Sequence, residues 1–181
     1  DAMVQVSGAV AVADNDDTAL QGAARWFKDA CSTRYEVQTQ YSFSDPCTAK
    51  QKQIIAIRGN GNLSTGAVIY AILEFCTTPS VYRVKIVHRD GSDQVSVLNT
   101  HTGIAGDPSG FMKLSYDSTT RKASLLLTVD SGPSVSLVST ELTALEDLDL
   151  GLVTAIGISF SGTGTPSNSN AILNVSGGSL G

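Results

Sequence analysis

The chain has 181 residues, of which 41% are hydrophobic and 16% are charged, and its formal net charge is −5. These values are typical of one folded domain, residues 1–181, and they exclude a disordered chain. Nucleic-acid binding is excluded because the twelve Lys and Arg residues are scattered, and a membrane span because the longest apolar stretch, residues 66–73, is far shorter than roughly 18 residues.

Alternation of apolar and polar residues with a period of two recurs along the chain, and it is typical of half-buried strands. In residues 35–43, the odd-numbered positions predict the core face and the even-numbered positions predict the exposed face. A short helical turn is expected within residues 140–149. The other strands are expected at residues 3–6, 9–12, 53–58, 67–75, 82–87, 94–98, 111–116, 123–129, 134–138, 152–160 and 171–176. About twelve short strands in one domain indicate an all-β sandwich or barrel.

Three cysteines cannot all pair within one chain, and an exposed thiol near the turn at Cys47 favours one disulfide over three free thiols. Strands 53–58 and 67–75 are expected to be antiparallel neighbours, which brings Cys47 and Cys76 to one end of the pair. We therefore expect a Cys47–Cys76 disulfide, with Cys31 free. A disulfide, together with many Ser, Thr and Gly residues and few Lys residues, favours a secreted or cell-surface protein.

Catalytic arrangements are weakly supported by the residues present. His88 and His101 are the only histidines, and neither lies near a nucleophile motif, so a hydrolytic triad is not expected. No expected strand carries two acids on one face, as glycoside hydrolysis would favour. Asp147 and Asp149 have the required spacing, but their segment is interpreted as a solvated connection. We therefore expect a protein that is not an enzyme.

Calcium is the one cofactor for which the sequence offers ligands. The loops containing Asp14, Asp16 and Asp17, and Asp90 and Asp93, are rich in the oxygen ligands that hard cations prefer. Exposed polar turns with solvated charges are the alternative interpretation.

Residues 152–160, with the small-residue turn that follows and a closing strand at 171–175, resemble the late strands of legume lectins. The hairpin formed by residues 111–127 is similar to another part of that family. We interpret residues 18–28 as a strand, despite their helical pattern, because they resemble its opening strands. The resemblance to the concanavalin A-like lectin/glucanase family implies a two-sheet antiparallel β-sandwich (a concanavalin-like jelly roll). It carries over no metal ligand, and laminin-G-like modules share this fold without the lectin metal site.

The resemblance implies glycan binding on an exposed sheet face, so we expect a non-catalytic extracellular carbohydrate-binding module whose partner is a glycan or polysaccharide. The alternation places Glu36 and Lys113 on an exposed side, and Phe111 is an additional aromatic candidate. The candidate sugar-binding residues are Trp26, Gln38, Gln40, Tyr70, Arg83 and Lys85. The alternative is a structural or adhesive module that binds other subunits of a surface assembly, which would show an uncovered edge strand or a large apolar patch.

Overall fold

The computed structural model describes residues 33–42, 50–59, 65–75, 83–107, 109–151, 153–161 and 176–179. No helix within these residues is long and apolar enough to cross a membrane. The described elements are β1 (Arg34–Ser42), β2 (Lys50–Gly59), β3 (Val68–Phe75), β4 (Arg83–Arg89), β5 (Val95–Thr102), β6 (Ser109–Asp117), β7 (Lys122–Val129), β8 (Val135–Val138), α1 (Ala144–Asp149), β9 (Val153–Ser161) and β10 (Ser176–Ser179).

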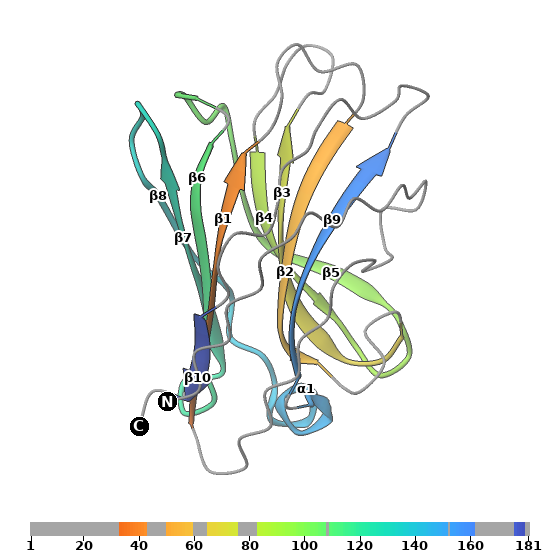
Figure 1. Ribbon diagram of the computed structural model, residues 1–181. Coiled ribbons are helices and arrows are strands. Elements are labelled where there is room, and N and C mark those ends of the chain that lie inside the picture. Colours follow the sequence, from red (N-terminus) through yellow and green to blue (C-terminus); the bar gives the residue numbers. More distant parts are fainter. Residues whose placement is uncertain are drawn as a thin grey trace.

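The strands form two five-stranded sheets that face each other (Figure 1). The first sheet has the order β10-β1-β6-β7-β8 and the second has the order β5-β4-β3-β2-β9. Every neighbouring pair is antiparallel. The expected two-sheet antiparallel sandwich is therefore confirmed.

The first sheet has one buried face and one open face. In β6 and β7, buried residues alternate with half-buried or exposed ones, as the period-two pattern predicts. Val37, Leu114 and Leu125 are 0–1% exposed and point into the main core between the sheets. The neighbours of these residues along each strand point to the opposite, outer face. This outer face is the open surface on which the candidate site lies.

Strands β2 and β3 of the second sheet are buried on both faces. Ile55 and Ile69 belong to the main core, whereas Ile54, Val68 and Tyr70 belong to a separate buried cluster on the outer side. A strand that is buried on both faces needs no polar alternation, which explains the nearly continuous apolar runs in β2 and β3. Tyr70 is 2% exposed, and burial raises the pKa of its hydroxyl, so the interpretation of this ring as an exposed aromatic is wrong.

Several further expectations are settled by the strands. The hairpin expected within residues 111–127 is formed by β6 and β7, and the short helical turn is α1. The strand expected at 94–98 extends to Thr102 and includes His101. Strands 3–6, 9–12 and 18–28 and the closing segment 171–175 lie outside the described residues, and the nearest described strand, β10, begins at Ser176.

Helix α1 contacts residues of both sheets at one end of the sandwich (Figure 1). Thr143 caps the helix N-terminus, and its hydroxyl accepts a hydrogen bond from the Glu146 N–H, while the Glu146 side chain accepts one from the Thr143 N–H. The helix carries Asp147 to Arg58 of β2 and Tyr116 of β6. The α1 segment has no buried residue, in agreement with its interpretation as a solvated connection, but Asp147 takes part in these contacts with the sandwich.

Candidate functional site

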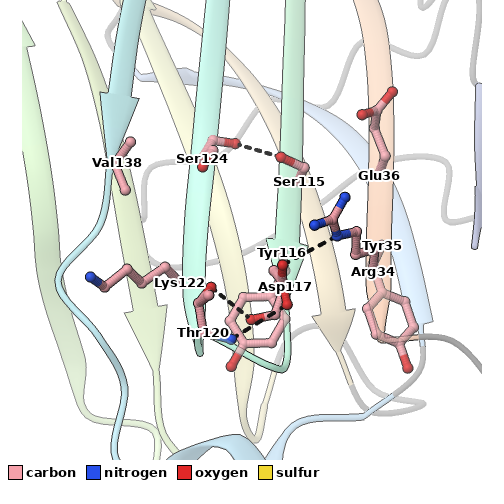
Figure 2. Close-up of a pocket in the computed structure, with 10 residues that line it drawn as sticks. All are labelled: Arg34, Tyr35, Glu36, Ser115, Tyr116, Asp117, Thr120, Lys122, Ser124 and Val138. Atoms are coloured by element: carbon pink, nitrogen blue, oxygen red, sulfur yellow. Dashed lines mark hydrogen bonds and ion pairs between the residues drawn. The ribbon is translucent and has the colours of Figure 1, made fainter. Parts of the chain in front are cut away.

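A groove of about 380 Å³ crosses the outer face of the first sheet (Figure 2). Its central row consists of Glu36 on β1, Ser115 on β6, Ser124 on β7 and Val138 on β8, which are successive cross-strand partners. Because serine is small, the middle of this row is lower than the rows of longer side chains beside it. The Ser115 hydroxyl donates a 3.4 Å hydrogen bond to the Ser124 carbonyl oxygen. The cross-strand register therefore makes the groove run across the strands.

Charged side chains line the groove and its surroundings. Arg34 and Asp117 are cross-strand partners, with 3.2 Å between Arg34 Nε and Asp117 Oδ2. Glu36 lies 3.4 Å from the ammonium nitrogen of Lys113, one row further along β6. Lys122 is the register partner of Asp117 on β7. The groove therefore offers both hydrogen-bond donors and acceptors to a polar ligand.

The hairpin turn fixes the Asp117 carboxylate. Its Oδ1 accepts hydrogen bonds from the N–H groups of Thr119 (2.8 Å) and Thr120 (3.4 Å), as in the turns that Asp residues commonly start. The Thr119 hydrogen bond above all, with help from the Arg34 guanidinium, holds the pKa of Asp117 below its usual range. Asp117 is therefore ionised and oriented at neutral pH.

A buried polar network supports the groove from the inner side of the sheet. A bulge in the pairing of β2 with β9 and a left-handed backbone (φ 58°) turn Arg58 inward near the end of β2. Its Nη1 donates a 2.9 Å hydrogen bond to the Tyr35 hydroxyl, and its Cζ lies 4.7 Å from the centre of the Tyr35 ring. The Tyr116 hydroxyl donates a 2.6 Å hydrogen bond to Asp147, and burial raises its pKa. Tyr35 and Tyr116 are themselves among the residues that line the groove, so this network fixes the strands that form it.

The expected sugar-binding residues do not form one cluster. Gln38 and Gln40 lie on the outer face of β1, on the same face as the groove. Arg83 and Lys85 lie on β4 of the other sheet, where both form ion pairs with the buried Glu74. Trp26 lies outside the described residues. The expectation that the outward Gln, Arg and Lys side chains share one face is therefore wrong.

In the loop of residues 90–93, one of the two expected to bind calcium, both aspartates interact with other groups of the protein. Asp90 Oδ1 accepts hydrogen bonds from the N–H groups of Ser92 and Gln94. Asp93 Oδ1 accepts one from Gly66 and lies 3.7 Å from Arg89 Nε. Within the described part of the chain, no group of three or more His, Cys, Asp or Glu residues could hold a metal ion. The other expected ligands, Asp14, Asp16 and Asp17, lie outside that part, and calcium binding stays a prediction.

The cysteine pairing also stays a prediction, because Cys31, Cys47 and Cys76 all lie outside the described residues. Its premise is confirmed, since β2 and β3 pair antiparallel with Gln51 opposite Phe75. The chain before β2 and the chain after β3 therefore start from the same end of this strand pair.

His88 is a buried titratable group next to α1. Its side chain is 3% exposed, its Nδ1 lies 3.8 Å from Glu146 Oε1, and its Nε2 forms no hydrogen bond with any residue that the structure describes. Burial lowers the pKa of His88, although the carboxylates of Glu146, Asp90 and Asp149 act in the opposite direction. The neutral imidazole is therefore the form that the folded protein prefers.

We expect this histidine to make the protein less stable as the pH falls below about 6.5, the ordinary pKa of histidine. In that range the unfolded chain binds a proton that the folded chain does not, so the free energy of unfolding falls until the pH passes the lowered folded-state pKa. Urea unfolding of the wild type and of His88→Gln between pH 7.5 and 5 measures the effect. Equal pH slopes for the two proteins would contradict it.

Glycoside hydrolysis needs two carboxyl groups, and two meet in the groove across strands. Glu36 and Asp117 are diagonal neighbours on β1 and β6, a relation that places Cβ atoms roughly 7–8 Å apart. A spacing of two residues along one strand does not reveal this pair, because its acids lie on different strands. The hairpin pattern offered a partial signal, because a turn after Asp117 places Lys122 opposite it and Ser124 opposite Ser115.

Comparison with known proteins gives information on the fold only. No family model and no curated protein matches the chain. A solved structure of the GH43 protein BlXynB (a K247S mutant) from Bacillus licheniformis matches with a TM-score of 0.53 and 14% identity, over 97% of this chain and 31% of that chain. The basic winged bean lectin, solved with Tn-antigen, matches with a TM-score of 0.48 and 18% identity, over 90% of this chain and 79% of that chain.

The chain thus spans about a third of the length of the GH43 protein. The structural likeness agrees with the expected fold class, and the fold is that of a concanavalin-like β-sandwich. At 14% identity it assigns no activity, substrate or site to this chain.

Proposed function

We propose that this protein is a non-catalytic, extracellular carbohydrate-binding module and that its glycan lies in the groove across β1, β6, β7 and β8. The observation that carries the proposal is the groove itself, an open trough of about 380 Å³ with small residues in its floor. Its volume falls in the range of roughly 300–1,000 Å³ that is usual for small-molecule sites.

The chemistry of the groove suits sugar hydroxyl groups, which both donate and accept hydrogen bonds. Arg34 with Asp117 and Lys113 with Glu36 set donors next to acceptors, and Ser115 and Ser124 add hydroxyls between them. Ion pairs that already exist before binding hold these groups in place, so little side-chain entropy is lost when a ligand binds. Val138 is 52% exposed at one end of the row and offers apolar contact.

A binding role fits the groove better than hydrolysis does. Glycoside hydrolysis by two carboxyl groups requires one of them to keep a proton near neutral pH, which usually requires a raised pKa. The pKa of Asp117 is instead lowered by the N–H group of Thr119, and Glu36 forms an ion pair with Lys113. These features support a binding module, and they make the pair Glu36 and Asp117 a poor acid–base pair.

Filling the groove should abolish binding. We expect Ser124→Tyr to reduce glycan affinity at least about tenfold, because the ring occupies the centre of the groove and displaces ligand contacts. The ligand is first found on a glycan array, with and without calcium, and affinities are then measured by calorimetry. Both serine and tyrosine are tolerated on an exposed strand position, so the fold should survive.

Thr128→Tyr is the matched control, because Thr128 is also exposed, lies on the same face of β7 and is four residues from Ser124. It should leave the affinity unchanged within about twofold. Equal losses in the two variants, or no loss in Ser124→Tyr, would place the binding site elsewhere. A glycan array without any hit would contradict the proposed function.

An assembly module is the second candidate, and β5 is the observation that favours it. This edge strand is largely exposed, carries no Asp, Glu, Lys or Arg, and presents Val95 and Val97 at 42% and 56% exposure. Edge strands of this kind are usually protected by charges, because their free backbone groups can pair with another strand. Light scattering of the wild type and of Val97→Lys tests this role, and a monomer at all concentrations for both would argue against it.

A further inference from the structure

The charged groups in and beside the groove include one unmatched cation. Two cations, Arg34 and Lys122, and two acids, Glu36 and Asp117, line the groove. Lys113, which lies beside the groove, pairs with Glu36, and Arg34 pairs with Asp117. With Lys113 counted, one positive charge is left over, on a protein whose net charge is −5.

Lys122 carries the surplus charge. Its register partner Asp117 is already used by Arg34 and by the N–H groups of Thr119 and Thr120. The ammonium group of Lys122 forms no hydrogen bond or ion pair with any described residue, unlike those of Lys85 and Lys113. Figure 2 shows the Lys122 side chain extended away from Asp117, on the side of the groove where Val138 lies. It is thus a cation at the groove wall to which no described residue supplies a counter-charge.

We propose that the groove binds an anionic glycan, one that carries a carboxylate or a sulfate group, and that Lys122 pairs with this group. The inference rests on the proposed carbohydrate-binding function and specifies its ligand class. The anion supplies the missing charge, and the neutral hydroxyls of the same glycan contact Ser115, Ser124 and the ion-paired walls. Lysine acts as a point charge with freely rotating donors, so it accepts either anion without the planar geometry that arginine favours.

The test compares glycans that differ only in charge. Oligogalacturonate and its methyl ester differ in the carboxylate, and a sulfated galactan oligosaccharide and its desulfated form differ in the sulfate. We expect the wild type to bind at least one anionic form about five- to tenfold more tightly than its neutral form, as a charge-assisted hydrogen bond permits. The preference should shrink as sodium chloride is raised from 20 to 500 mM, since salt screens an open groove.

Lys122→Gln should lower the affinity for the anionic form to about that for the neutral form, whereas Lys122→Arg should retain most of the preference. Lys85→Gln changes the net charge equally on the other sheet and should keep the wild-type preference. Equal affinities of the wild type for charged and neutral forms would overturn the inference and leave the proposed function intact. An absence of binding to every glycan would overturn both.

Discussion

Replacement of Gly110 by alanine is expected to destabilise the protein by about 4 kcal/mol, or to prevent folding. Gly110 lies on β6 between Tyr41 of β1 and Val129 of β7, and its φ of 150° is rarely adopted by other residues. A Cβ atom there would lie 1.9 Å from the Thr128 carbonyl oxygen and 3.0 Å from the Tyr41 hydroxyl. Backbone strain and overpacking each cost about 1–3 kcal/mol.

The glycine has a structural purpose, because the Tyr41 hydroxyl reaches across it to donate a 3.2 Å hydrogen bond to the Thr128 carbonyl oxygen. An added methyl group would separate these two atoms as well as strain the strand. Chemical denaturation measures the loss of stability, and a folding assay by circular dichroism covers the case of a protein that no longer folds.

Gly103→Ala is the matched control. Gly103 also has a positive φ, 72°, but a Cβ atom there would have no neighbour within 4 Å. Only the backbone cost should remain, about 1–2 kcal/mol. Similar losses in the two variants would show that backbone conformation, and not the close approach of β7, makes Gly110 necessary.

The sequence predicts the strands of the first sheet better than those of the second, because one face of the first sheet is exposed to solvent. Alternation appears only where one face meets water, so β1, β6 and β7 were correctly located and their core faces correctly assigned. In β2 and β3 both faces are buried, and apolar residues such as Ile54 and Ile55 follow one another. The pattern there locates the strands, but it contains no information on which face meets the other sheet.

The groove is harder to predict because it depends on which distant strands are neighbours. The hairpin of β6 and β7 is local, so the pairs of Ser115 with Ser124 and of Asp117 with Lys122 follow from the turn length alone. The pairing of β1 with β6 joins residues that are 67 to 83 positions apart in the sequence, and no local pattern determines it. Without this pairing, Gln38 and Lys85 both had to be treated as exposed polar residues, although they lie on different sheets.

Arg58→Met is expected to destabilise the protein by about 3 kcal/mol. Methionine keeps much of the apolar stem, but the Tyr35 hydroxyl then loses its 2.9 Å donor and the Asp147 carbonyl oxygen loses its 3.2 Å donor. The Asp147 carboxylate, 3.7 Å from Arg58 Nη2, loses the cation that balances it. Removal of one partner of a buried ion pair costs about 3–5 kcal/mol. We expect the lower end because Asp147 keeps 20% exposure and because Arg58 Nε bonds to none of the described residues.

The variant Arg34→Met shows whether burial or the nitrogen–oxygen distance of an ion pair determines the loss of stability. The Arg34–Asp117 pair is shorter, at 3.2 Å between nitrogen and oxygen, but the Arg34 side chain is 66% exposed, compared with 10% for Arg58. Exposed pairs contribute about 0–1 kcal/mol, so this variant should lose at most that amount in urea unfolding. If instead the two variants lose equal stability, the contact between α1 and the sandwich is not a buried polar network of the kind described.

A double-mutant cycle of Arg58→Met with Asp147→Asn measures this contact directly. The structure predicts a coupling free energy of about 1–3 kcal/mol, because Arg58 and Asp147 interact directly. A cycle without coupling would contradict the network.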